Sequence, residues 1–211
     1  TTTELINKVN DIESGGTSVI NPEWTDWRYF SYYDNRNDLV AKLKYSDTAN
    51  GTNFSSMFYA CSLLTTIPQL DTSNGTNFGA MFNGCSALTS ILQLSTSNGT
   101  NFNGMFNGCS ALTTIPLLNM SNVSGTSWSN MFYNCTALEN VTFEGTIPVR
   151  GNITVFSTCP NLTVESLMSF INALTNMSDT ATYTITIGST NLAKLTEEQI
   201  QIATDKRITL Q

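Results

Sequence analysis

"MFNGCSALTSI" spans Met81–Ile91 and "MFNGCSALTTI" spans Met105–Ile115, so ten of eleven residues recur after 24 positions. The five cysteines recur with nearly the same period: the intervals between Cys61, Cys85, Cys109, Cys135 and Cys159 are 24, 24, 26 and 24 residues. A fixed period of about 20 to 30 residues with recurring apolar positions is typical of a solenoid, in which neighbouring coils bury each other's apolar faces. The sequence therefore predicts a stack of coils.

Each copy places the same residue types around its cysteine. In the third copy these are Phe102, Met105, Leu112 and Ile115. A weaker copy lies one period upstream of the first, with Asn37 in the cysteine position. We therefore expect a solenoid over residues 54–162, preceded over 17–53 by an N-terminal cap that contains this degenerate repeat.

Two segments of a coil predict local structure. "ALTTIPLL" (Ala111–Leu118) predicts a short strand with Leu112 and Ile115 turned inward, ending near Pro116 because proline has no N–H for the ladder. "NFNGMFNGC" (Asn101–Cys109) predicts a helical or 3₁₀ return, because its apolar residues have the spacing of one helical face. Asparagines also recur at the corners, and we expect a stacked ladder that caps main-chain groups: Asn50, Asn74, Asn98 and Asn122.

The two ends of the chain depart from the repeat. Residues 1–16 form an apolar helix pattern followed by glycines, which suits either a self-association segment or a helix lying on the cap. Residues 163–211 predict a C-terminal α/β cap: a helix capped by Thr163, a strand over 182–188, a helix with a capping box at Thr196, and a strand from Arg207. This order favours a parallel crossover, and we expect these strands to extend the sheet of the solenoid.

Composition excludes several partners. The net charge is −7, and the nine Lys and Arg residues are scattered, which argues against nucleic-acid binding and against an anionic membrane surface. No apolar run is long enough to insert in a membrane, and no signal-peptide pattern follows Thr1.

Catalytic and metal sites are also disfavoured. The chain has no histidine and no close cysteine pair, so the usual zinc ligands and the usual general base are missing. Each cysteine lies in the inward phase beside Phe and Leu, where a free thiol acts as a small apolar group. We predict no metal, no cofactor and no enzymatic activity.

An aromatic cluster precedes the repeats. "EWTDWRYFSYY" (Glu23–Tyr33) holds six aromatics in eleven residues. Such a cluster covers the open end of a first coil. The alternative is that Trp24 and Trp27 stack on sugar rings.

The outward positions of the predicted strands would tile an inner curved, or concave, face with hydroxyl and amide groups, a surface suited to an extended polar ligand. A solvated sheet face is the other interpretation, since Thr also favours strands. The residues concerned are Thr65, Thr66, Gln69, Thr89, Ser90, Gln93, Thr113, Thr114, Glu139 and Asn140.

The phrases "MFNGCSALTTIP" and "LDTSNGTNF" resemble the BspA-like leucine-rich-repeat surface proteins of bacteria, in the variety with Met-Phe, Cys, Leu and Ile-Pro in each copy. The resemblance covers about residues 54–162. It implies an α/β fold: a right-handed leucine-rich-repeat solenoid of about five 24-residue coils. It also implies an extracellular or cell-surface location and adhesion through an exposed curved face.

Two functions follow as hypotheses. The first is a non-enzymatic recognition module that binds a host or cell-surface protein or glycan through the concave face. The alternative is a structural spacer or assembly part of a surface or phage-tail-like fibre, joined to its neighbours through residues 1–16.

Overall fold

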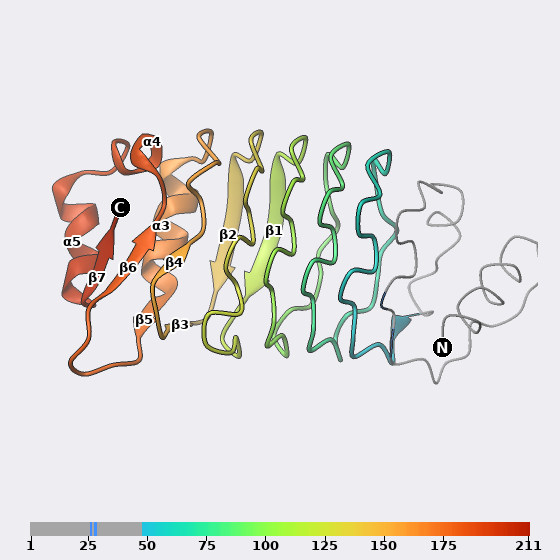
Figure 1. Cartoon of the computed structure of the whole chain (residues 1–211), viewed down its shortest axis with the longest axis horizontal. Helices are drawn as coiled ribbons and strands as arrows, with labels where there is room; N and C mark the ends of the chain where they lie inside the picture. The colour runs from blue at the N-terminus through green and yellow to red at the C-terminus, as the bar shows by residue number, and fades with distance from the viewer. Residues whose placement is uncertain (1–25, 27, 29–47) are drawn as a thin grey trace, which may run out of the picture.

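The computed structural model describes residues 26, 28 and 48–211. From residue 48 onward the chain winds through successive coils that lie side by side along one axis (Figure 1). Parallel bridges join equivalent residues of neighbouring coils, as between Asn53 and Asn77, Asn77 and Asn101, and Ser90 and Thr114. The segment 1–16 and the degenerate repeat of the N-terminal cap lie outside the described residues.

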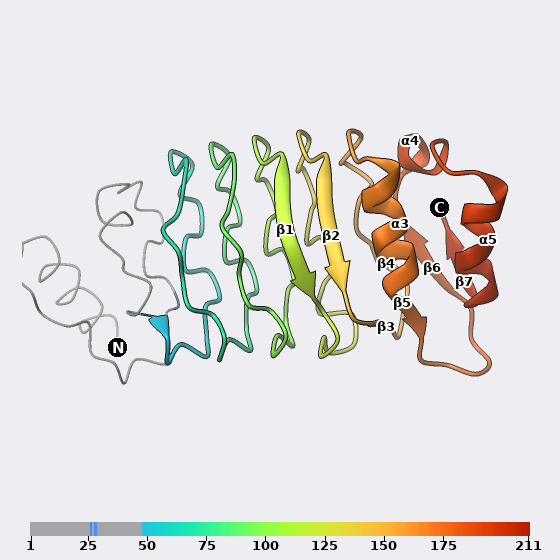
Figure 2. The same cartoon turned by 180° about the vertical axis from the view of Figure 1, so that it is seen from behind.

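Each coil has two long sides. We call residues 54–61, 78–85, 102–109 and 128–135 the turn side, and residues 64–70, 88–94, 112–118 and 138–144 the strand side. On the strand side, β1 (Thr114–Asn119) pairs in parallel with β2 (Asn140–Glu144), and both are seen from the front in Figure 2.

Leu112 and Ile115 are buried, which confirms the predicted inward phase of the strand. The predicted end of the strand near Pro116 is wrong, because β1 continues to Asn119. The register between β1 and β2 shifts between Ile115 and Leu117, so Pro116 has no partner residue in β2. The missing N–H of this proline therefore costs the ladder no hydrogen bond.

The turn side is not helical, contrary to the sequence prediction. Met105 N donates to Phe102 O (3.1 Å) and Cys109 N to Phe106 O (3.0 Å), but Phe106 N donates instead to Met131 O of the next coil (2.9 Å). Every second N–H is therefore used between coils and cannot form a bond along a helix. Left-handed backbone at Gly104 (φ 60°) turns the chain between successive tight turns.

The core consists of columns of equivalent apolar side chains, one from each coil. The best formed is a column of stacked phenylalanines with ring centroids 5.0 to 5.9 Å apart: Phe58, Phe82, Phe106, Phe132 and Phe156. The five cysteines are buried free thiols, as predicted. Each of the last four donates from Sγ to a phenylalanine carbonyl of the preceding coil, as Cys109 does to Phe82 O at 3.1 Å. Stacking thus buries the apolar side chains and at the same time gives these thiols hydrogen-bond acceptors.

The predicted asparagine ladder is confirmed at three of its four positions. The amide nitrogens of Asn74, Asn98 and Asn122 donate to main-chain carbonyls one coil upstream, at 2.9, 2.8 and 2.7 Å. These asparagines hold the corners of adjacent coils together.

The C-terminal part contains short elements and two longer helices. In chain order they are β3 (Ile147–Val149), β4 (Ile153–Thr154), α3 (Val164–Ala173), β5 (Leu174–Asn176), β6 (Tyr183–Thr186), α4 (Ser189–Leu192), α5 (Glu197–Asp205) and β7 (Ile208–Leu210). The predicted caps are confirmed: Thr163 accepts from Ser166 N, and Thr196 and Gln199 form a capping box. The strands β6 and β7 pair in parallel.

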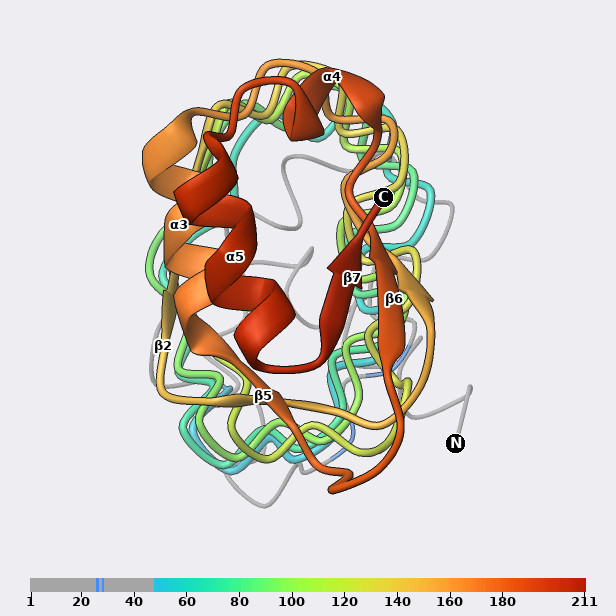
Figure 3. The ribbon, with the colours of Figure 1, turned by 90° about the vertical axis from the view of Figure 1, so that its left-hand side faces the viewer.

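The C-terminal strands do not extend the β1–β2 sheet, so that prediction is wrong. They form a separate sheet in the order β4-β6-β7, and Asn130 N of the turn side donates to Thr154 O of β4. Figure 3 shows α3 and α5 on the side of β2, opposite β6 and β7. Two serine hydroxyls of α3 stand in for the main-chain carbonyls of a neighbouring strand. Val141 N of β2 donates to Ser166 Oγ (3.0 Å), and Phe143 N donates to Ser169 Oγ (2.8 Å). Helices therefore continue the strand side, and strands continue the turn side.

Candidate recognition surface

The predicted binding residues lie together on the strand side. Equivalent positions are joined by main-chain bonds, including Thr89 N to Thr65 O (3.3 Å), Thr113 N to Thr89 O (3.4 Å) and Glu139 N to Thr113 O (3.0 Å). Eight of the ten form two exposed rows across four coils: Thr65, Thr89, Thr113 and Glu139, and Thr66, Ser90, Thr114 and Asn140.

The two glutamines have a structural role that the sequence did not indicate. Gln93 Nε2 donates to Leu94 O and Leu117 O, both at 2.7 Å, and its Oε1 accepts from Leu117 N at 3.1 Å. Gln69 Nε2 makes the equivalent bonds, to Leu70 O at 3.2 Å and to Gln93 O at 2.9 Å. These amides replace ladder bonds between coils, so their N–H groups are not available to a ligand.

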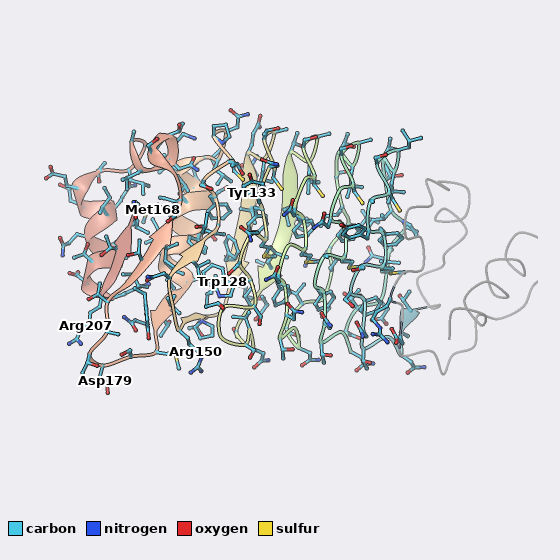
Figure 4. The ribbon with its side chains drawn as sticks, in the orientation of Figure 1. Trp128, Tyr133, Arg150, Met168, Asp179 and Arg207 are labelled. Carbon is cyan, nitrogen blue, oxygen red and sulfur yellow. The ribbon has the colours of Figure 1, made fainter. Side chains whose placement is uncertain are left out.

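An apolar strip on the same side was not predicted from the sequence. Leu92 is 48% exposed and Leu117 is 37% exposed, and Pro68 and Pro116 beside them are half-buried. The available signal was the break in the repeat: Leu92 stands where two copies have proline, and Leu117 stands where two copies have glutamine. Half-buried Met168 of α3, labelled in Figure 4, lies farther along the stack.

A hollow of about 540 Å³ runs along this side, close to the ends of the strands. Its lining comes from four successive coils and includes the residues that we call the strand-side groove: Gln69, Asp71, Gln93, Leu117, Asn119 and Glu144. The groove is therefore made by repetition and not by any single loop.

Charge along the stack has one sign. Residues 48–149 contain no Lys or Arg, and their only ionisable acids are Asp71, Glu139 and Glu144. Glu139 and Glu144 belong to the strand side, and Asp71 directly follows it in the first coil. The basic residues Arg150 and Arg207 lie toward the C-terminal end of the molecule (Figure 4).

The thiols are poorly suited to chemistry. Burial raises the pKa of Cys85 and Cys109, so both stay protonated and weakly nucleophilic. Within the described part of the chain, no group of three or more Cys, Asp or Glu residues is arranged to hold a metal ion. Trp24 and Trp27, predicted as sugar-stacking residues, lie outside the described residues.

No helix within residues 48–211 is long and apolar enough to cross a membrane.

Repeated coils joined by parallel main-chain bonds, with one exposed side of mixed polar and apolar character, define a stacked repeat protein. The chain belongs to the family described as "Mycoplasma protein of unknown function, DUF285", whose model matches residues 28–144, just over half of its length. No curated protein and no solved structure matches the chain.

Proposed function

We propose that this chain is a BspA-like leucine-rich-repeat solenoid that acts at the cell surface as a non-enzymatic recognition module, binding a protein or glycan of another surface through its strand side. Met-Phe, Cys, Leu and Ile keep the same spacing in successive copies, which supports the assignment to BspA-like leucine-rich repeats. The family match over residues 28–144 is compatible with it.

One observation carries the recognition role: the exposed Leu92 and Leu117 lie beside rows of Thr and Ser on the strand side. Apolar side chains flanked by polar groups are the usual composition of a binding surface. A surface that only separated two other parts of a protein would have no need of exposed leucines.

A recognition role, as opposed to catalysis, is supported by the residue types that this side presents. They are Thr, Ser, Asn, Leu and carboxylates, without histidine anywhere in the chain and with each cysteine thiol buried. None of the exposed groups is an activated nucleophile.

The test is a binding screen of the full chain against a glycan array and a panel of matrix proteins. The variant Thr89→Lys/Thr113→Lys puts two charges on the strand side, while Asn103→Lys/Thr154→Lys puts the same two charges on the turn side and β4. We expect a ligand that the first variant loses and the second retains, with unchanged circular dichroism for both.

A ligand that both variants bind equally well would overturn the placement on the strand side. If the wild-type chain binds nothing on the glycan array and none of the matrix proteins, the recognition role is overturned and a structural spacer is favoured.

A further inference from the structure

The two glutamines of the strand-side groove use both of their N–H groups within the stack. Both N–H groups of Gln69 and both of Gln93 donate to main-chain carbonyls. The hydroxyl of Thr72, which also lines the groove, likewise donates to Ser95 O of the next coil at 2.9 Å. Stacking of the coils therefore consumes the amide donors of both glutamines and the hydroxyl donor of Thr72.

The groove retains its acceptors. The Glu144 carboxylate has no hydrogen-bond or ion-pair partner among the described residues, and Asp71 accepts one bond, from Ser73 N at 3.0 Å. Gln93 Oε1 accepts one bond, which leaves one of its two lone pairs unused. Without any Lys or Arg in residues 48–149, no cation of the stack neutralises these groups. A complementary ligand supplies positive charge and donors to these carboxylates.

The spacing of the acceptors suits an extended chain. Asp71 and Glu144 belong to coils three steps apart, and strands are spaced by about 4.8 Å, so the two positions are separated by about 14 Å along the stack. Four residues of an extended peptide span about 13 Å, and residues i, i+2 and i+4 of such a peptide face the same way. Exposed Leu117 lies between the carboxylates, two coils from Asp71 and one coil from Glu144, and offers an apolar contact to residue i+2.

We propose that the strand-side groove binds an extended segment of a partner protein that carries two basic residues four positions apart and an apolar residue midway between them. The basic side chains pair with Asp71 and Glu144, and the apolar one lies on Leu117. This assignment rests on the proposed recognition role of the strand side and names the chemical class of its partner.

The probe is the peptide acetyl-Lys-Ser-Leu-Ser-Lys-amide, titrated into the ¹⁵N-labelled full chain and followed by NMR. The charge-reversed probe has Glu in place of both Lys. The protein variant Asp71→Asn/Glu144→Gln removes both charges and keeps the acceptor for Ser73 N, and Asp179→Asn/Glu197→Gln removes two charges from the C-terminal part (Asp179 is labelled in Figure 4).

We expect amide shifts confined to residues 69–73, 93–97, 117–119 and 144. The affinity for the Lys peptide should fall about 2- to 30-fold in Asp71→Asn/Glu144→Gln and stay unchanged in the matched control, since each exposed ion pair contributes modestly. Raising the NaCl concentration should weaken binding, because salt screens exposed charges.

Absence of shifts, shifts located elsewhere, or equal binding of the Glu peptide would overturn the cationic partner. The recognition role would survive that result if a ligand from the screen were still lost in Thr89→Lys/Thr113→Lys. Failure of the recognition role has a different signature, namely a screen in which strand-side charges change nothing.

Discussion

Replacement of Phe106 by alanine tests the central column of the stack. The Phe106 ring is completely buried and lies between Phe82 (centroids 5.6 Å apart, 5° between planes) and Phe132 (5.9 Å, 7°). Truncation of a buried phenylalanine costs about 3 to 5 kcal/mol. Because Phe106→Ala also removes two stacked pairs, each contributing about 0.5 to 1.5 kcal/mol, we expect a loss of about 4 to 8 kcal/mol.

The matched variant Phe106→Leu separates stacking from burial. Leucine restores most of the apolar contact and loses only the ring pairs, so its cost should be about 1 to 3 kcal/mol. Both free energies of unfolding are measured by urea titration, followed in parallel by circular dichroism and by tryptophan fluorescence. Coincident curves from the two probes establish two-state unfolding, which the comparison needs.

A loss below about 1 kcal/mol for Phe106→Ala would refute the inward phase of the column. A cost below about 0.5 kcal/mol for the leucine variant would refute the contribution of stacking, because leucine loses only the ring pairs.

Three further predictions concern the polar groups that join the coils. Asn98→Asp removes an amide donor and sets a carboxylate against a carbonyl, so the free energy of unfolding should fall by about 1 to 3 kcal/mol. Asn103→Asp is the matched control, because the side chain of Asn103 makes no hydrogen bond among the described residues, and it should change the free energy of unfolding by less than about 0.5 kcal/mol. Gln93→Met keeps the length of the side chain but leaves main-chain groups of two coils unpaired, so the free energy of unfolding should fall by about 1 to 3 kcal/mol. An unchanged urea midpoint would contradict the role of Gln93 in joining the coils. Burial raises the pKa of the thiols of Cys85 and Cys109, so the folded chain retains protons that the unfolded chain loses above about pH 8.5. The free energy of unfolding should therefore decline above that pH by about 1.4 kcal/mol per pH unit for each thiol. Urea titrations at a series of pH values measure this decline, which should be less steep in Cys109→Ala.

The candidate surface was only partly accessible to sequence reasoning. Alternation around Leu112 and Ile115 was enough to place Thr89 and Thr113 outward, because side-chain direction along a strand depends on local periodicity. The role of Gln93 was not accessible, since its three partners belong to the main chain of its own coil and of the next. A polar residue in an outward position is equally compatible with binding a ligand and with bonding a neighbouring coil.

The sequence by itself determined the period of the coils and the identity of the residues that point inward. It also determined the corner asparagines, because a residue that recurs every 24 positions must stack on its own copies. Helix caps at Thr163 and Thr196 were equally local, since each depends on residues within one turn.

Only the tertiary structure decided the turn side and the C-terminal end. The spacing of Phe102, Met105, Phe106 and Cys109 fits one face of a helix, yet alternate N–H groups there find carbonyls in the next coil, and the helix does not form. Ser166 and Ser169 could be recognised as substitutes for a strand only once α3 was placed beside β2. Side-chain periodicity fixes which residues are buried, but the partner of each main-chain group is fixed by the neighbouring coil, which lies 24 or more residues away.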